Sequence, residues 1–425
     1  MIRAKEDTKA FLQGLCAAHF GSAALEQAAG VGDSLVVFAS APGRVELAGN
    51  HTDHQGGCTI SAAIDQRAYA LAAPNDSEEI RVFMDGFGEA SFCISDLEAR
   101  SGERGESLSL IRGMAAAYVQ SGGALCGFDM VTCSDIPVGR GLSSSAAFEV
   151  LIGVSIRTLC DPMAPAKPLD ITALALEGVW AEHTYFGKPC GAQDQLASAY
   201  GGVIALDFSD EMPLVTPIGF DFSTCPYSIY LIDSRCDHSR FTDEYAAIPT
   251  DMQAVAQHFD STRLEDVSYC EFLGQLPQVR AGLGDRAVLR ALHYFEETQR
   301  VKAQVRALQA GSFEEFLKMV RLSGASSAQF LQNVSPRSDE SGDSQPAMVI
   351  LALCAQLLES TDLMSSGYHR GAYRIHGGGF GGSVLAFVPK QEADEFRVSM
   401  NTLLGYDVCL PISITSQGAH AERLV

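Results

Sequence analysis

The stretch from Pro137 to Ala147 reads PVGRGLSSSAA and is the most informative part of the chain. Gly139 and Gly141 permit backbone angles at which successive N–H groups converge on one point. Three serines, residues 143–145, follow at once, and AAFEVLIGVSIRTL then predicts a helix over residues 143–159. Such a helix presents free N–H groups and a positive dipole end to an anion. The stretch therefore indicates a phosphate-binding loop. A glycine-rich turn before a serine-capped helix would have the same sequence.

A second dense motif lies towards the N-terminus, where residues 41–57 read APGRVELAGNHTDHQGG. It gathers polar, directional side chains in a short span: Arg44, Glu46, Asn50, His51, Asp53 and His54. Such a set suits a small polyhydroxylated ligand, because each sugar hydroxyl needs a partner. The spacing of the two histidines could instead indicate a metal site, but no third ligand is recognisable. A polar surface loop is the remaining alternative.

A third motif, RIHGGGFGGS, occupies residues 374–383. Five glycines within seven residues indicate a close approach of the backbone to a ligand or to another loop. A glycine hinge without a ligand would also explain them.

Around these motifs the pattern predicts a mixed α+β fold. Expected strands are residues 34–39 (ending at Ala41-Pro42-Gly43), 45–48, 59–72, 80–84, 128–133, 203–208, 228–232 and 383–388. Expected helices are one or two within 4–28, and 108–120, 143–159, 171–186, 297–309 and 313–319. Residues 335–345 have no periodicity and are expected to form a polar loop. A domain boundary is expected near residue 215.

Length and composition limit the class of protein. With 425 residues the chain is too long for one ordinary core, so two domains are expected. A net charge of −22 disfavours nucleic acid and anionic membrane as partners. No apolar run reaches the roughly 18 residues that suggest a membrane span, and the N-terminal MIRAKEDTKAF has no signal-peptide pattern. The twelve cysteines contain no C-x-x-C pair, which indicates reduced thiols and a cytoplasmic location.

In this order and spacing the motifs resemble those of the GHMP kinases, and within them the galactokinases. The segment GRVELAGNHTDHQGG resembles the galactokinase signature, PVGRGLSSSAA the family's phosphate loop, and RIHGGGFGGS its third motif. A fourth stretch runs from Glu182-His183 to PCGAQDQ at residues 189–195, and it resembles the galactokinase pattern E-H-x₅-PCG-x-x-DQ. The motifs span residues 41–383, nearly the whole chain.

The resemblance implies a two-domain α+β fold with the active site between the domains. Residues 1–215 would form a ribosomal-protein-S5-like domain and residues 216–425 a ferredoxin-like domain. It also implies transfer of the ATP γ-phosphoryl group to the C1 hydroxyl of galactose, with Mg²⁺. The implied partners are the sugar and ATP, and we expect a monomer that binds neither nucleic acid nor membrane.

Roles at the phosphate end are carried over by matching positions. Asp194 matches the catalytic aspartate, which can accept the proton of the C1 hydroxyl. Arg44 matches the arginine beside it, and its charge would keep Asp194 ionised. Ser145 and Glu182 match the Mg²⁺ ligands. The positions that would line the ATP phosphates are Gly139, Arg140, Gly141, Ser143, Ser144 and Ser145.

The sugar side departs from the family pattern. The matching sugar-binding positions are Asn50, His51, Asp53, Gly191 and Tyr245. However, Asn50 stands where galactokinases have glutamate, Glu46 where they have asparagine, and His54 where they have tyrosine. Two explanations are open for the exchange. Either the pair has traded places in one hydrogen-bond network, or the loss of an anion at position 50 admits a 6-carboxylate.

Two other functions therefore stay open beside galactose phosphorylation. One is a kinase for galacturonate, N-acetylgalactosamine or arabinose. The other is a regulator that binds sugar and ATP without turnover. The presence of Asp194, Arg44, Glu182 and Ser145 argues against the regulator.

Overall fold

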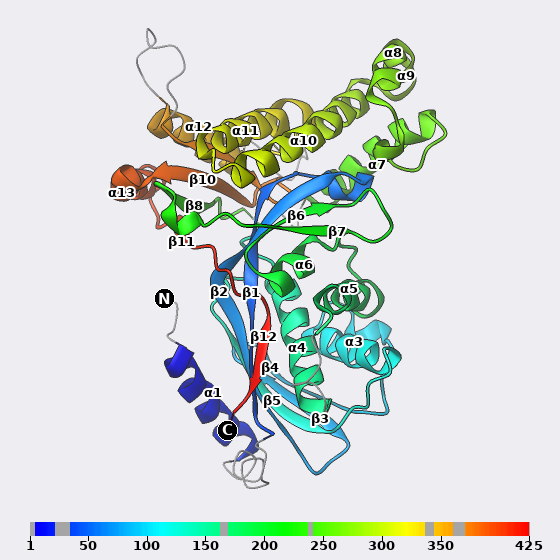
Figure 1. Ribbon diagram of the computed structural model, residues 1–425, viewed down its shortest axis with the longest axis vertical. Helices are drawn as coiled ribbons and strands as arrows, with labels where there is room; N and C mark the ends of the chain where they lie inside the picture. The colour runs from blue at the N-terminus through cyan, green and yellow to red at the C-terminus, as the bar shows by residue number, and fades with distance from the viewer. Residues whose placement is uncertain are drawn as a thin grey trace.

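Two β-sheets organise the protein, and helices cover both of them (Figure 1). The computed structural model describes residues 5–21, 35–161, 169–236, 241–335, 344–359 and 370–424. The expected α+β class is confirmed, because both sheets and both helical sets belong to one mixed architecture.

The first sheet has eight strands in the order β12-β1-β2-β5-β3-β4, with β6 paired to β2 and β7 to β6. All pairings are antiparallel except β3 with β5. The strands are β1 (Val37–Ala48), β2 (Cys58–Pro74), β3 (Glu79–Met84), β4 (Gly88–Cys93), β5 (Phe128–Ser134), β6 (Val203–Asp207), β7 (Leu214–Ile218) and β12 (His420–Arg423). The strands predicted over 59–72, 80–84, 128–133 and 203–208 are present in this sheet.

The first long strand corrects a prediction. The sequence predicted a strand that ends at Ala41-Pro42-Gly43 and a second one over 45–48, but β1 runs through both and is buried along its length. The register against β2 shifts between Pro42 and Arg44, so a bulge accommodates the proline, which has no N–H to donate. At this bulge the backbone N–H of Arg44 donates to the carbonyl of Leu142 at 3.2 Å. The irregularity thus ties β1 to the predicted phosphate loop.

Helices cover the first sheet on both faces (Figure 1). On one face lie α3 (Ser107–Gln120), α4 (Ser144–Cys160), α5 (Ile171–Ala181) and α6 (Gln193–Tyr200), and α4 and α6 pack directly on β1 and β2. On the other face α1 (Lys5–Phe20) packs on β2 and β5. Part of the predicted helical span 4–28 lies outside the described residues. The predicted helix 171–186 divides into α5 and a π-helical turn, η4 (Glu182–Phe186).

The second sheet is antiparallel, in the order β11-β8-β10-β9. Its strands are β8 (Tyr227–Asp233), β9 (Ala372–His376), β10 (Ser383–Pro389) and β11 (Cys409–Ile412). The helices of this part of the chain are α7 (Thr242–His258), α8 (Tyr269–Gly274), α9 (Leu276–Leu283), α10 (Asp285–Gln309), α11 (Phe313–Ser326), α12 (Pro346–Leu358) and α13 (Ala393–Leu404), and among them α11, α12 and α13 pack on the sheet. In Figure 1, α10, α11 and α12 form a layer over this sheet. The sequence predicted only the second half of α10 and the first half of α11.

The chain crosses between the sheets twice. Strand β7, which contains residue 215, still belongs to the first sheet, and the last strand β12 returns to pair with β1. The division into residues 1–215 and 216–425 remains a prediction. Most of the predicted loop 335–345 lies outside the described residues.

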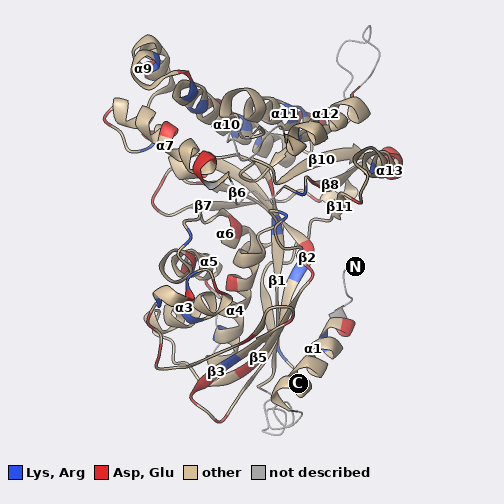
Figure 2. Ribbon diagram, turned by 180° about the vertical axis from the view of Figure 1, so that it is seen from behind, with Lys and Arg blue, Asp and Glu red and all other residues tan. Residues whose placement is uncertain are grey.

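Charged residues are distributed over both sets of helices, and basic residues gather along α9 and α10 (Figure 2). Many of these bases have acidic partners. Arg286 and Arg290 both pair with Asp251, and Arg300 pairs with Glu297. Among the helices that the structure describes, none is long and apolar enough to cross a membrane.

Candidate active site

A polar cavity of about 140 Å³ lies where the two sheets meet. Its lining comes from four parts of the chain: β1 with the loop after it, the first turn of α6 with the loop before it, helix α7, and the glycine-rich loop after β9. The lining residues are Arg44, Glu46, Asn50, His51, Asp53, Lys188, Pro189, Cys190, Gly191, Gln193, Asp194, Tyr245, Gly377 and Gly378. All the predicted catalytic and sugar-binding residues therefore lie together.

Asp194 is held from two sides at the edge of this cavity. It lies in the first turn of α6, where the helix dipole favours a negative charge. Arg44 donates from Nε to Asp194 Oδ1 at 2.8 Å, and its second terminal nitrogen lies 2.7 Å from the same oxygen. The Ser143 hydroxyl donates to the other oxygen, Oδ2. Both carboxylate oxygens thus have charged or polar donors, which fix the orientation of the carboxylate.

The predicted phosphate loop meets the cavity through these contacts. Gly139 and Gly141 have φ values of +77° and +75°, the left-handed region that favours glycine. Arg44 donates to the Gly141 carbonyl, and the Ser143 hydroxyl is directed to Asp194 rather than to the N–H groups of α4. The first turn of α4 therefore keeps backbone N–H groups that no Ser143 cap satisfies.

None of the six predicted phosphate residues, 139–141 and 143–145, lines the cavity. Ser144 and Ser145 lie in the first turn of α4, beside the cavity rather than in its wall. The Arg140 side chain pairs with Asp233 of β8 at 3.2 Å, and the Arg140 carbonyl accepts from the Ser383 hydroxyl at 3.2 Å. The loop is thus tied to the second sheet.

Glu46 and Asn50 belong to one buried network. Asn50 Nδ2 donates to Glu46 Oε1 at 3.2 Å, and Arg374 donates to the same oxygen at 2.8 Å. Asn50 Nδ2 also donates to the Gly377 carbonyl, and its oxygen accepts from Asn333 Nδ2 at 2.7 Å. The amide of Asn50 is therefore satisfied by protein groups, whereas Glu46 brings a carboxylate to the cavity wall.

His51, Asp53 and Tyr245 form the opposite wall. His51 Nε2 lies 3.0 Å from the Gly378 carbonyl, so this nitrogen carries the proton and donates. Burial, as the largest cause, lowers the pKa of His51 to about 3, and the ring is neutral at physiological pH. Burial likewise raises the pKa of Asp53. The Tyr245 ring packs against His51 with centroids 5.1 Å apart.

Two glycines of this wall have no room for a side chain. A Cβ on Gly191 would lie 2.5 Å from Asp53 Oδ2, and a Cβ on Gly378 would lie 2.3 Å from the Tyr245 ring. Close packing of backbone on these side chains explains why glycine stands at both positions.

Glu182 lies at the start of η4 and is buried, and it contacts the cavity-lining residue Lys188. Lys188 Nζ lies 3.0 Å from its Oε1, and Gln195 Nε2 donates to its Oε2 at 3.0 Å. In the part of the chain that the structure describes, no group of three or more His, Cys, Asp or Glu side chains is arranged to hold a metal ion. An ammonium group does contact the Glu182 carboxylate, so the position accepts a cation.

The sequence reasoning did not assign Lys188, Gln193, Asn333 or Arg374 to the site. Lys188 immediately precedes the PCG motif and Arg374 begins the third motif, so their places in the chain could have identified them. Asn333 lies in a segment without a motif, and only the fold brings it to Asn50.

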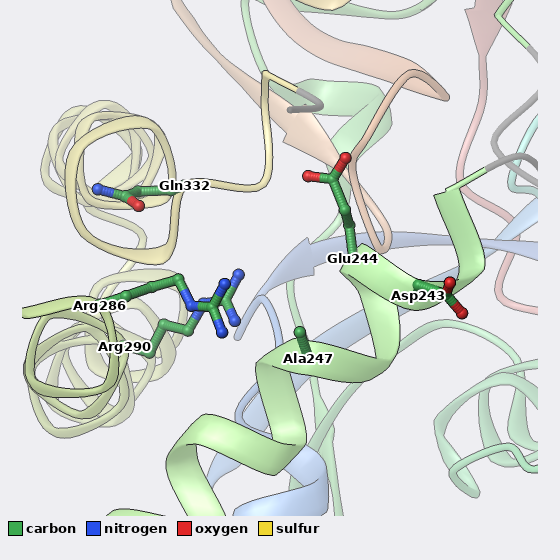
Figure 3. A pocket seen from close by; sticks show the side chains of 6 residues that line it. All are labelled: Asp243, Glu244, Ala247, Arg286, Arg290 and Gln332. Carbon is green, nitrogen blue, oxygen red and sulfur yellow. The ribbon is translucent and has the colours of Figure 1, made fainter. Parts of the chain in front are cut away.

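A second cavity, of about 180 Å³, lies between α7 and α10 (Figure 3). Its lining residues are Asp243, Glu244, Ala247, Arg286, Arg290 and Gln332. The two arginines point towards Ala247, and both pair with Asp251 at 2.6 Å. This cavity contains none of the motif residues.

Comparisons with known proteins agree with the geometry. Residues 109–202 match the family described as GHMP kinases N terminal domain, and residues 26–74 match the galactokinase galactose-binding signature. A galactokinase of Actinobacillus pleuropneumoniae is 31% identical over 366 residues, which are 84% of this chain and 86% of that protein. One of Glaesserella parasuis is 30% identical over 379 residues, covering 88% of this chain and 90% of that protein.

A solved structure shares the fold. Lactococcus lactis galactokinase, solved with galactose, superposes with a TM-score of 0.78 at 22% sequence identity and covers 98% of this chain and 100% of that one. The expectation of a GHMP kinase fold is confirmed.

Proposed function

The chain belongs to the galactokinase family of GHMP kinases, and on that premise we propose that it transfers the γ-phosphoryl group of ATP to the C1 hydroxyl of galactose. The products are galactose 1-phosphate and ADP. The observation that carries this proposal is the position of Asp194, held by Arg44 and Ser143 between the sugar cavity and the phosphate loop.

In the proposed reaction the C1 oxygen attacks the γ-phosphorus and the bond to the ADP oxygen breaks. The hydroxyl proton passes to Asp194, whose carboxylate is held in place by the ion pair with Arg44. Arg44 also lies beside the Gly141 carbonyl of the phosphate loop, so its charge can stabilise the transferring group.

We propose ATP phosphate binding by residues 139–145, supported by the left-handed glycines and the uncapped first turn of α4. Mg²⁺ would be held by Glu182 and the hydroxyl of Ser145. These are oxygen ligands of the kind it prefers, and the contact of Lys188 with Glu182 supports a cation there. When bound, Mg²⁺ would neutralise charge on the phosphate oxygens.

Galactose is favoured over galacturonate as the substrate because a carboxylate is retained in the cavity wall. Glu46 takes the place of the missing anion at position 50 and would repel a 6-carboxylate. The cavity's remaining polar groups, His51, Asp53 and Tyr245, suit the hydroxyls of a neutral sugar.

The test is a coupled ADP-release assay with galactose, galacturonate, N-acetylgalactosamine and arabinose, with the Asp194→Asn variant as the control. The expected result is the highest kcat/KM for galactose. A higher value for galacturonate would refute the substrate assignment, and no turnover of any sugar would support a binding protein instead.

We further infer a monomer that works in the cytoplasm. The net charge of −22 supports solubility and disfavours nucleic-acid partners. Sedimentation velocity over a range of protein concentrations tests the oligomeric state.

A further inference from the structure

A buried carboxyl group behind the site takes no part in the proposed reaction. Glu149 lies on α4, one helical turn after Ser145, and is fully buried. Its Oε2 accepts from Gln195 Nε2 at 2.9 Å. Gln195 is also fully buried, and it follows Asp194 on α6. A buried acid in such a place needs either a countercharge or a proton.

Two buried oxygens of this pair have no hydrogen-bond partner. They are Glu149 Oε1 and Gln195 Oε1. The amide nitrogen of Gln195 has two carboxylate acceptors, Glu149 Oε2 and, at 3.0 Å, Glu182 Oε2, and Cys190 Sγ lies 3.8 Å away as a weaker third acceptor. An ionised Glu149 would therefore leave two buried acceptors without a donor.

We propose that Glu149 is a protonated, neutral carboxylic acid whose Oε1–H donates to Gln195 Oε1, and that this acid–amide pair positions the metal-ligand candidate Glu182. One proton then satisfies both unpartnered oxygens and closes a ring of two hydrogen bonds. The ring fixes the Gln195 amide so that its second N–H is directed to Glu182.

The surroundings of Glu149 agree with a neutral acid. Burial and the nearby charge of Glu182 raise its pKa well above the ordinary value, while the hydrogen bond from Gln195 and the charge of Lys188 oppose the rise and Asp194 adds to it. Gly178 of α5 packs closely on the pair, because a Cβ there would lie 3.1 Å from Glu149 Oε2. No base contacts Glu149 in any hydrogen bond or ion pair of the described residues.

The inference depends on the proposed function only through the role of Glu182. Residues behind a metal ligand orient it, and their loss costs about 10–100-fold in metal affinity. Glu149 is accordingly a positioning residue, which acts through Gln195 and touches neither substrate nor metal.

The test compares Glu149→Gln with Glu149→Leu in the full-length protein. A glutamine can form the same two bonds with Gln195, so its Tm is expected to stay within about 2 °C of the wild type. The Mg²⁺ concentration for half-maximal activity is expected to change less than twofold. Leucine leaves the Gln195 amide unpaired, which should lower the Tm by several degrees and raise the Mg²⁺ requirement about tenfold.

Glu297 provides the matched control. It is as deeply buried as Glu149, but it pairs with Arg300 at 2.7 Å, and despite its burial the charge of Arg300 helps to lower its pKa to about 2. Glu297→Gln removes a real charge and should lower the Tm, unlike Glu149→Gln. Infrared difference spectra between wild type and Glu149→Gln should show the carbonyl stretch of a protonated carboxylic acid.

A loss of Tm in Glu149→Gln as large as in Glu297→Gln would overturn the proposal, and so would a spectrum without the protonated-acid band. Neither measurement uses Glu149→Leu, so both can be made even if that variant does not fold. They are also independent of turnover. If the protein phosphorylated no sugar but showed the protonated-acid band, the proposed function would be refuted and the proposal for Glu149 would not.

Discussion

Exchanging Glu46 and Asn50 by mutation tests the buried network of the sugar cavity. Glu46→Asn removes the carboxylate that contacts Arg374, whose side chain is 0% exposed. Breaking a buried ion pair from one side costs about 3–5 kcal/mol. The carboxylate of Glu297 also attracts the Arg374 charge, so Arg374 keeps one acidic neighbour in the variant. We therefore expect a loss at the lower end of this range, about 3 kcal/mol of unfolding free energy.

Asn50→Glu adds a carboxylate to the network instead of removing one. The new carboxylate would lie beside Glu46 Oε1, at a position where the amide now donates over 3.2 Å, and beside the Gly377 carbonyl. Two such charges at an effective dielectric constant near 20 would repel by about 5 kcal/mol. One carboxyl can instead take up a proton, which at pH 7 costs about 4 kcal/mol for an ordinary glutamate pKa. The expected loss is therefore about 4 kcal/mol or less.

The double variant restores one carboxylate and one amide to the network. We expect its loss to be at least about 2 kcal/mol smaller than the two single losses combined, because the sites share partners. Urea unfolding followed by circular dichroism measures the stabilities, and kcat/KM for galactose shows whether the cavity is restored. Glu315→Gln, on an exposed face, should change stability by less than about 0.5 kcal/mol. If Asn50→Glu were as stable as the wild type, or if the losses simply added, the network would not be coupled as described.

Three further predictions concern the proposed chemistry and the titration of the site. Asp194→Asn should lower kcat about 10²–10⁴-fold while sugar binding, measured by calorimetry, stays within a few-fold; activity within threefold of the wild type would refute its role. Ser145→Ala should raise the Mg²⁺ requirement and Glu182→Gln should raise it more; unchanged Mg²⁺ titrations in both would refute the metal assignment. Burial lowers the pKa of His54 to about 4. Between pH 6.5 and 4 the unfolded chain therefore binds a proton that the folded chain does not, so the free energy of unfolding falls as the pH falls. His54→Tyr should reduce that slope by about 1.4 kcal/mol per pH unit without changing it above pH 7.5; equal slopes below pH 6 would contradict the buried neutral state.

The residues of the site were largely predictable, because the motifs carry them at fixed spacing. Arg44, Asp53, Gly191 and Asp194 come from three separate elements, and the structure brings them to one cavity. The bonding of Asn50 was not predictable. Its donors and acceptors are satisfied by Asn333 and by the glycine-rich loop, which are far away in the sequence.

The fold was less predictable where local and tertiary preferences disagree. The Ala41-Pro42-Gly43 segment has the composition of a turn, yet pairing with β2 on a bulge keeps it in the strand. Helix α7 contains Pro249 and mixed charges, so its sequence alone does not favour a helix. It forms because Ile248, Met252 and neighbouring apolar side chains are buried in a core shared with α10.

The return of β12 to β1 limits how the two sheets can move relative to each other. The polypeptide crosses between them at residues 219–226 and again at residues 413–419. The sheets are also joined by packing, because one hydrophobic core contains side chains of β1 and β2 together with Leu231 and Phe387 of the second sheet. Arg44 and Asp53 come from the chain before the first crossing, and Tyr245 and Gly378 come from the chain between the two crossings. The two tethers and the shared core therefore hold the facing residues of the polar cavity in register.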